Sequence, residues 1–410
     1  MRMKTFIGLF LLLLTAGTTM AQQKSLAGWW RVELHRPDGQ AIVFNFEWTV
    51  EKGKPVWFIR NASERIRVTD IQSKGDSLMV QMPLYESQFR LKKDKAGNAI
   101  TGNWIKGGAV KTTILPFTAS RSGQRFPAAP DASFNINGRW AATFINKNNT
   151  DPAIAEFRQR VNYVTGTFLN PTGDYRYLEG VINHDSLVLS CFDGGHAFLF
   201  TATIDSKNVI RNGMFYSGAV FKQEWKAVKN DTATLPADDV AMYLRPGEEK
   251  LHFTFNDLDG KPVSINDERF KNKVVVVQLM GSWCPNCMDE TAFLSDYYNR
   301  NKGRGIEIVS LAYEYSTDRL RSIKTLKKFQ QRFNVQYPML ITGVTVNDSL
   351  RTEKTLPELT PIKFFPSSAI LDKQGRVRKL DTGFNGPATG EHYLIYKKEF
   401  QHTIDKLLAE

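Results

Sequence analysis

Residues 274–290 read VVVVQLMGSWCPNCMDE. The stretch opens on an apolar run with the length of a buried strand. Cys284 and Cys287 follow with two residues between them, and residues 288–300 have helical character. A strand that delivers such a pair to the start of a helix is typical of a redox dithiol. The unpaired N–H groups and the positive dipole end of the helix favour a thiolate on Cys284.

A zinc site is the alternative interpretation of the same two cysteines. Structural zinc takes four ligands, and the sequence offers no second Cys or His pair at ligand spacing. Cys191 lies among apolar residues at the end of an expected strand and is interpreted as a buried, inert thiol. Four residues around it fit no strong ligand pattern: His184, Asp185, Asp193 and His196. We therefore expect neither a metal nor a cofactor.

Length and composition limit the number of domains and the kinds of partner. A chain of 410 residues predicts two or three domains, and a hydrophobic fraction of 42% suffices for real cores. Three cysteines are too few for a disulfide-stapled scaffold. The formal charge is +12, but basic residues are scattered among acidic ones, so we expect no nucleic-acid binding.

Residues 1–21 predict a secretory signal peptide. Arg2 and Lys4 give a positive start, residues 6–14 an apolar centre, and residues 19–21 a small-x-small cleavage site. The apolar centre is too short to span a bilayer comfortably, although a retained anchor is the alternative. We therefore expect a periplasmic or otherwise extracytoplasmic protein, with no stable membrane insertion after removal of the signal.

Residues 22–228 contain a faint internal repeat with an offset of about 110 residues. Three landmarks recur: Gly28-Trp29-Trp30 with Gly138-Arg139-Trp140, Asp76-Ser77-Leu78 with Asp185-Ser186-Leu187, and Gly102-Asn103-Trp104 with Gly213-Met214-Phe215. Runs of β-branched and aromatic residues between turn signals predict two antiparallel β units, 22–128 and 134–228, as sandwiches or small barrels. Four tryptophans are assigned to their cores rather than to a sugar-stacking platform: Trp29, Trp30, Trp48 and Trp57.

Residues 229–250 break the strand pattern with two prolines and are interpreted as a linker. Residues 251–410 predict an α/β domain, in which strands and helices alternate around a mixed sheet. The expected elements are a hairpin at 253–265, strands at 274–280, 306–312 and 337–340, a helix at 320–333, a long loop to 361, a hairpin at 366–382 and a helix at 391–408. Leu320 and four further apolar residues recur at helical spacing in the 320–333 helix and predict an apolar face, while its basic residues are assigned to a solvated face.

Further motifs follow the cysteine pair. Glu290 stands three residues after it, Phe365-Pro366 comes later, and Asp372-Lys373-Gln374-Gly375 joins two expected strands. Together with residues 274–287, these motifs resemble the thioredoxin superfamily. The closest resemblance is to the extracytoplasmic TlpA-like (ResA-like) thiol–disulfide oxidoreductases. It covers residues 251–410 and implies a thioredoxin-like fold there.

The resemblance also implies roles for individual residues. Cys284 would be the exposed, attacking cysteine, and Cys287 would resolve the mixed disulfide. Trp283 resembles the aromatic residue that shields the sulfur, with a plain core residue as the alternative, and Pro285 is placed with it at the substrate-binding surface.

Phe365-Pro366 resembles the cis-proline segment that faces the disulfide in this superfamily. The backbone of Phe365 would then pair with the substrate like an added strand. Many members of the superfamily have a buried Asp where this chain has Gln278. In the TlpA-like branch an acid at the position of Glu290 would exchange protons with Cys287 instead; a surface helix glutamate is the alternative.

We therefore expect a multidomain protein, with a duplicated antiparallel β region followed by an α/β thioredoxin-like domain. The expected function is the reduction of disulfides in extracytoplasmic proteins, with an upstream electron donor as second partner. One alternative is a glycan- or protein-binding β region with an accessory redox domain. Another is a peroxiredoxin-like peroxidase, which requires Thr or Ser where this chain has Gly281.

Overall fold

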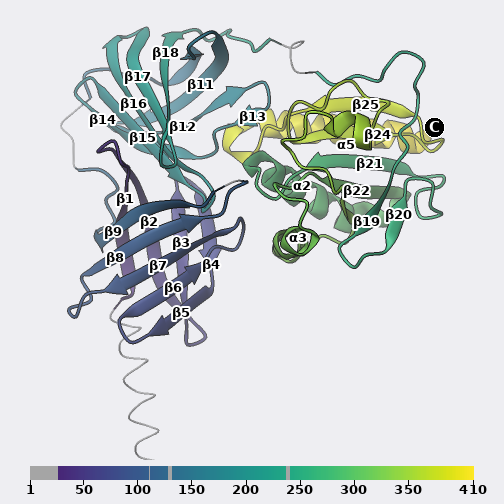
Figure 1. The fold of residues 1–410 in the computed structure, drawn as a ribbon. Helices are drawn as coiled ribbons and strands as arrows, with labels where there is room; N and C mark the ends of the chain where they lie inside the picture. Colours follow the sequence, from purple (N-terminus) through teal and green to yellow (C-terminus); the bar gives the residue numbers. More distant parts are fainter. Residues whose placement is uncertain (1–25, 110, 128–131, 237–240) are drawn as a thin grey trace, which may run out of the picture.

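The computed structural model describes residues 26–109, 111–127, 132–236 and 241–410. Within these ranges the chain forms three sheets: two of nine strands in the N-terminal part and one of seven strands in the C-terminal part. Figure 1 shows the two N-terminal β units one above the other, with the C-terminal unit beside them. The protein is thus multidomain, as expected. The predicted signal peptide lies outside the described residues.

The first sheet is antiparallel and has the order β4-β3-β2-β1-β9-β8-β7-β6-β5. Apart from β4 and β5, which end the order on opposite sides, consecutive strands pair with each other, and glycines with positive φ such as Gly39 and Gly75 stand in two of the connecting turns. Its strands are β1 Gly28–His35, β2 Ala41–Glu51, β3 Lys54–Asn61, β4 Glu64–Val68, β5 Asp70–Lys74, β6 Ser77–Gln81, β7 Ser87–Lys93, β8 Ala99–Lys106 and β9 Thr113–Arg121.

The second sheet has the order β11-β10-β18-β17-β16-β15-β14-β12-β13. β11 pairs with β10 on one side and with β12 on the other, so this sheet closes on itself and is barrel-like. Its strands are β10 Gly138–Ile145, β11 Thr150–Arg160, β12 Tyr163–Asn170, β13 Gly173–Asp174, β14 Leu178–Asn183, β15 Ser186–Phe192, β16 Ala197–Ser206, β17 Val209–Ser217 and β18 Phe221–Lys229.

Both N-terminal units begin with the same local structure. Trp30 Nε1 donates to the carbonyl of Leu26 at 2.9 Å, and Trp140 Nε1 donates to the carbonyl of Ile136 at 2.9 Å. The first strand of each unit pairs with the second and the last, β1 with β2 and β9, β10 with β11 and β18. The other repeat landmarks also fall on strands of equal rank, at β6 and β15 and at β8 and β17.

The two N-terminal units share apolar packing. Phe192, at the end of β15, stacks on Phe44 of β2 with ring centroids 4.1 Å apart. Ala197 and Leu199 of β16 join the same buried cluster. Of the tryptophans assigned to the cores, Trp29 is the exception: it is 40% exposed, because alternate residues of β1 face solvent.

The C-terminal sheet has the order β20-β19-β23-β22-β21-β24-β25. Its central strand, β21, has every residue buried, runs parallel to β22 and antiparallel to β24. The strands are β19 Thr254–Asp257, β20 Pro262–Ser264, β21 Val274–Met280, β22 Ile306–Ala312, β23 Met339–Ile341, β24 Ser367–Leu371 and β25 Val377–Thr382. The helices are α2 Pro285–Asn301, α3 Arg319–Phe333, α4 Arg351–Thr355 and α5 Glu391–Ala409.

Three expectations for the C-terminal part need correction. Leu320, assigned to the apolar face of α3, is 77% exposed because it lies in the first turn, beyond the sheet. The long loop before residue 361 contains the short helix α4. The basic face of α3 is not solvated throughout, since Arg321 Nε donates to Glu86 of the first unit at 2.8 Å.

The expected linker, 229–250, is also more integrated than its composition indicates. Met242 is buried in the C-terminal core, and backbone bridges join Leu244 to Leu359 and Lys250 to Arg376. From the first β unit, Leu84 and Tyr85 enter the same core. The β region therefore packs directly on the C-terminal unit.

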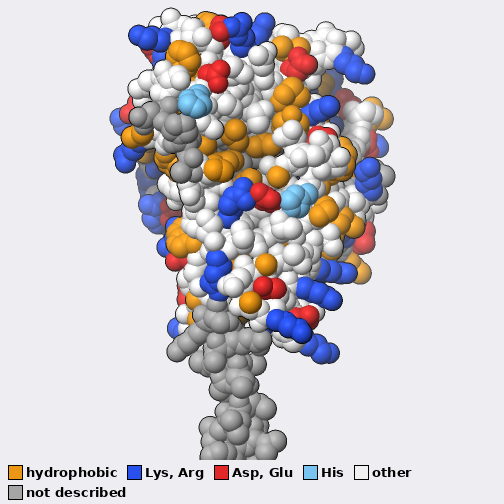
Figure 2. Space-filling model, turned by 90° about the vertical axis from the view of Figure 1, so that its left-hand side faces the viewer, with side chains coloured by type: hydrophobic (Ala, Val, Ile, Leu, Met, Phe, Trp, Pro, Cys, Tyr) orange, Lys and Arg blue, Asp and Glu red, His pale blue; other side chains and the backbone are white. Residues whose placement is uncertain are grey.

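The face in Figure 2 shows acidic and basic side chains interspersed with hydrophobic ones, rather than a patch of one sign. Within the described ranges, no helix combines the length and the apolar composition needed to cross a membrane.

Candidate functional site

The cysteine pair lies at the transition from β21 to α2. Cys284 is the N-cap residue of α2, with an extended backbone (φ −97°, ψ 122°). Its Sγ accepts a hydrogen bond from Cys287 N at 3.2 Å. Pro285 occupies the first helical position, where its missing N–H costs nothing. Both cysteines are free thiols.

Cys284 is less accessible than the resemblance implied. It is only 3% exposed, and Cys287 is fully buried. The Cys284 thiol donates to the carbonyl of Phe365 at 3.5 Å, and the Phe365–Pro366 peptide bond is cis. The segment before β24 thus lies against the sulfur and covers it.

Aromatic side chains line one side of the site. Trp283 Nε1 donates to the carbonyl of Tyr313 at 2.9 Å, which fixes the indole. Its ring stacks on Tyr315 at 5.2 Å and meets Phe365 edge-on at 5.8 Å. Trp283 therefore connects Tyr313, the residue directly after β22, to the cis-proline segment.

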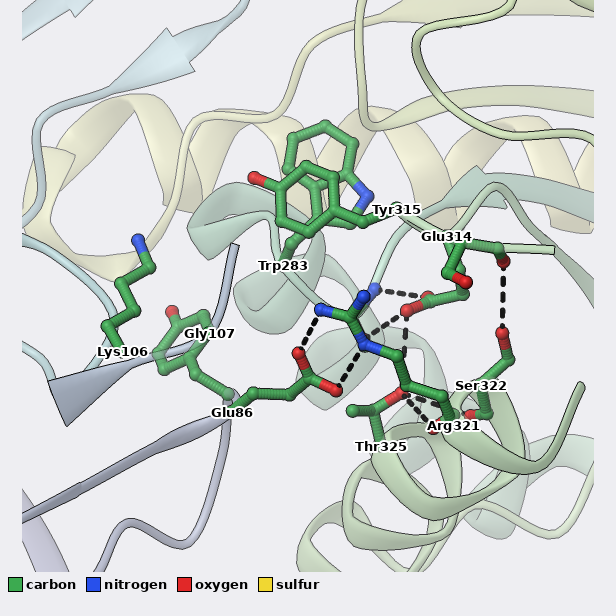
Figure 3. A pocket seen from close by; sticks show the side chains of 12 residues that line it. Glu86, Lys106, Gly107, Trp283, Glu314, Tyr315, Arg321, Ser322 and Thr325 are labelled. Atoms are coloured by element: carbon green, nitrogen blue, oxygen red, sulfur yellow. Dashed lines mark hydrogen bonds and ion pairs between the residues drawn. The ribbon is translucent and has the colours of Figure 1, made fainter. Parts of the chain in front are cut away.

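A cleft opens beside Trp283, between the first β unit and the C-terminal unit (Figure 3). Glu86 and Lys106 line it from the β side, while Trp283 and Tyr315 line it from the other side. The ion pair between Glu86 and Arg321 joins the two sides of the cleft. The β region consequently forms part of the surface next to the dithiol.

Glu290 lies on α2, one turn beyond Cys287, and is buried rather than on the surface. Burial raises the pKa of Glu290 to about 8, opposed by the hydrogen bond from Gln278 and supported by the charge of Asp381. Gln278 Nε2 donates to Glu290 Oε2 at 2.8 Å. Gln278 and Glu290 therefore form one polar pair between β21 and α2.

The thiol of Cys287 is strongly disfavoured from ionising. Burial is the largest cause of its raised pKa, followed by the hydrogen bond and the charge of Cys284, and Glu290 adds to it. Loss of the Cys287 proton thus needs a nearby acceptor or a change of surroundings.

Residues of the second β unit contact the cysteine motif, which the sequence analysis did not predict. Arg176 Nη1 donates to Asp289 Oδ2 at 2.5 Å and to the carbonyl of Pro285 at 3.3 Å. Asp174 Oδ2 accepts from Gly386 N at 2.8 Å. Contacts across so many residues carry no local periodicity, so no pattern within either segment predicts them.

Of the remaining candidates near Cys191, Asp193 and His196 contact each other, whereas His184 and Asp185 are exposed residues of a turn. Cys191 is buried, and burial is the main cause of its raised pKa. His196 Nδ1 lies 3.1 Å from Asp193 Oδ2 in a hydrogen-bonded pair. In the part of the chain that the structure describes, no group of three or more His, Cys, Asp or Glu side chains is arranged to hold a metal ion.

Comparison with known proteins places the C-terminal part. The Redoxin family model matches residues 245–393. Thiol-disulfide oxidoreductase ResA of Bacillus thuringiensis subsp. konkukian is 28% identical over 148 residues, which cover 36% of this chain and 76% of that protein. ResA of Bacillus subtilis is 23% identical over 140 residues, which cover 34% of this chain and 69% of that protein.

Among solved structures, a thiol:disulfide interchange protein of the thioredoxin family from Chlorobium tepidum is 20% identical. The match has a TM-score of 0.29 and covers 40% of this chain and 99% of that one. The family model and the ResA relatives together confirm the resemblance drawn from the sequence: the C-terminal part of this chain is ResA/TlpA-like and similar to the thiol–disulfide oxidoreductases of the thioredoxin superfamily.

Proposed function

We propose that this protein is an exported reductase of protein disulfides that works through Cys284 and Cys287. One observation carries the proposal: two free thiols lie at the start of α2, and the first contacts the backbone carbonyl of Phe365. A backbone beside the sulfur offers a substrate chain a strand-like partner. The substrates are disulfide-containing proteins outside the cytosol.

The chemistry balances as two exchanges. The Cys284 thiolate attacks one sulfur of the substrate disulfide, that S–S bond breaks, and the first substrate thiolate leaves. Cys287 then loses its proton and attacks Cys284 Sγ, which releases the second substrate thiolate and forms the Cys284–Cys287 disulfide. The substrate gains two electrons, and the two thiolates take up protons. A dithiol donor returns the enzyme to its reduced form.

Glu290 is proposed as the proton acceptor for Cys287. It is buried on the same helix as Cys287, three residues later, and its raised pKa lets it exchange a proton near neutral pH. Gln278 would hold the carboxylate in place through its hydrogen bond.

Trp283, Pro285, Phe365 and Pro366 are proposed to form the substrate-contacting surface. The stacking of Trp283 on Tyr315 and its edge contact with Phe365 make this surface rigid and apolar. The cleft between Trp283 and Lys106 supports a substrate-contacting role for the β region in the same reaction, rather than a separate glycan-binding function.

We also propose that the two β units are copies of one ancestral unit. The paired tryptophan anchors of Trp30 and Trp140 and the equal strand ranks of the repeat landmarks support this. Superposition of the units through these tryptophans provides a test, and strands that failed to coincide from β6 and β15 onward would contradict common origin.

Reactivity tests the assignment of the nucleophile. In the reduced protein, Cys284 should react with iodoacetamide about tenfold or more faster than Cys287 or Cys191 at neutral pH, because its sulfur lies at a helix N-terminus. Mass spectrometry of peptides after timed alkylation measures the three rates. Equal rates at Cys284 and Cys191 would remove Cys284 from this role.

Trapping tests the order of attack. Cys287→Ser should accumulate a mixed disulfide between Cys284 and insulin, because nothing resolves it, while Cys284→Ser should neither trap nor reduce insulin. Cys191→Ser is the matched control and should reduce insulin like the wild type. A Cys284→Ser variant that retained activity would refute the proposal.

Glu290→Gln tests the proton acceptor. Glu290 accepts protons only in its ionised form, so resolution in the wild type should accelerate as the pH rises through about 8. The variant should resolve roughly tenfold more slowly and lack this rise. Stopped-flow measurement of thiol release from a preformed Cys284 mixed disulfide gives both values.

Glu358→Gln is the matched control, since Glu358 is a buried glutamate paired with His252. An identical pH profile in Glu290→Gln and the wild type would leave Glu290 without a part in resolution.

The mass of the protein isolated from the periplasm tests export, because it shows whether the predicted signal peptide has been removed. Expressed with its natural N-terminus in a Gram-negative host, the protein should appear in the periplasm with Gln22 as its first residue, because a signal peptidase cuts after small residues. A full-length chain retained in the cytosol would contradict export.

A further inference from the structure

The second β unit presents a buried arginine to the cysteine motif. Arg176 lies between β13 and β14 and is 1% exposed. Its backbone is left-handed, with φ 60°, a conformation that non-glycine residues rarely adopt. Asp174 Oδ1 accepts from Arg176 N at 2.6 Å and stabilises this turn. This backbone conformation directs the Arg176 guanidinium toward the start of α2.

The guanidinium joins all three parts of the chain. It bonds Asp289 of α2 and Glu64 of β4, and its Nε lies 3.8 Å from Asp193 Oδ2, just after β15. One further bond, at 3.3 Å, goes to the carbonyl of Pro285, between the two cysteines. Arg176 is thus a single cation shared by three carboxylates at the start of α2.

The turn that carries Arg176 also holds the other residue between the cysteines. In the amide orientation that satisfies both atoms, Asn286 donates to the carbonyl of Asp174 and accepts from its N–H, both at 3.2 Å. A Cβ at Gly173 would lie 2.0 Å from the Asn286 amide, so only glycine allows this approach. Both residues between the cysteines are therefore held by the second β unit.

Resting on the function proposed above, we infer that Arg176 is a positioning residue of the redox site: it fixes the first turn of α2 through Pro285 and neutralises carboxylates beside that turn. Two effects follow. The helix N–H groups stay aimed at Cys284 Sγ, as the bond from Cys287 N shows. Burial raises the pKa of Asp289 to about 7, and the charge of Arg176 opposes that rise. The guanidinium thus favours the ionised form of Asp289 and balances its charge together with that of Glu64.

Removal of the Arg176 side chain should change the redox equilibrium of the dithiol and the reactivity of Cys284 in a defined direction. Without Arg176, Asp289 and Glu64 lose the cation that they share beside the first turn of α2, whereas Asp193 keeps its pair with His196. The reduced protein then loses stability relative to its disulfide form. The dithiol becomes a stronger reductant, and Cys284 reacts more slowly with alkylating agents.

Arg176→Met in the full chain tests this. We expect alkylation of Cys284 to slow about tenfold at neutral pH. We also expect the equilibrium with glutathione to shift about tenfold toward the Cys284–Cys287 disulfide, which is about 30 mV for a two-electron couple. Arg211→Met is the matched control, because Arg211 forms an exposed ion pair with Asp205 in the same β unit. It should change neither value.

A second variant separates charge from folding. Asp289→Asn removes one carboxylate and keeps the shape, so it should accelerate alkylation and shift the glutathione equilibrium the opposite way. Loss of packing would not reverse the sign. If Arg176→Met fails to fold, Asp289→Asn alone decides: an unchanged or slower rate overturns the inference.

The two proposals fail in different ways. A wild-type protein that forms no reversible disulfide between Cys284 and Cys287 contradicts the proposed function itself. A wild type with a reversible disulfide and a folded Arg176→Met variant with the same alkylation rate and glutathione equilibrium contradicts only the role of Arg176.

Discussion

The hydrogen bond from Cys287 N to Cys284 Sγ at 3.2 Å is the contact on which the redox site depends. It exists because the buried strand β21 ends one turn before α2 and leaves Cys284 at the helix cap. Every other feature of the site maintains this arrangement. Phe365 covers the sulfur from the cis-proline segment, Gln278 and Glu290 fill the space between strand and helix, and Arg176 holds the first helical turn.

The β region is therefore part of the redox machinery in a physical sense. Tyr85 of the first unit bonds Asp193 at 3.1 Å and touches the sulfur of Met288, which directly follows the second cysteine. In the second unit, Arg176 bonds the carbonyl of Pro285, and the backbone of Asp174 bonds the side chain of Asn286. These contacts surround a motif whose first cysteine, Cys284, is almost fully enclosed.

Much of the C-terminal part was predictable from the sequence. The run at 274–280 could only be a central strand, and the spacing of the cysteines fixed the start of α2. The burial of Cys284 was not predictable, since it depends on Phe365, which lies 81 residues later in the chain. Leu320 was misassigned because helical periodicity does not tell which turn extends past the sheet. Arg176 escaped notice because a lone arginine in a turn carries no pattern; its three carboxylate partners come together only in the folded protein.

The stacking of Phe192 on Phe44 also has a consequence for biogenesis. The nine strands of the first sheet end at Arg121, but three residues of its core, Phe192, Ala197 and Leu199, belong to the hairpin of β15 and β16. During synthesis, the strands of the first sheet are complete before Phe192, some 70 residues later, can fill the aromatic core. Closing a loop of that length is slow relative to the pairing of neighbouring strands. The two β units should consequently mature as one cooperative body rather than in succession.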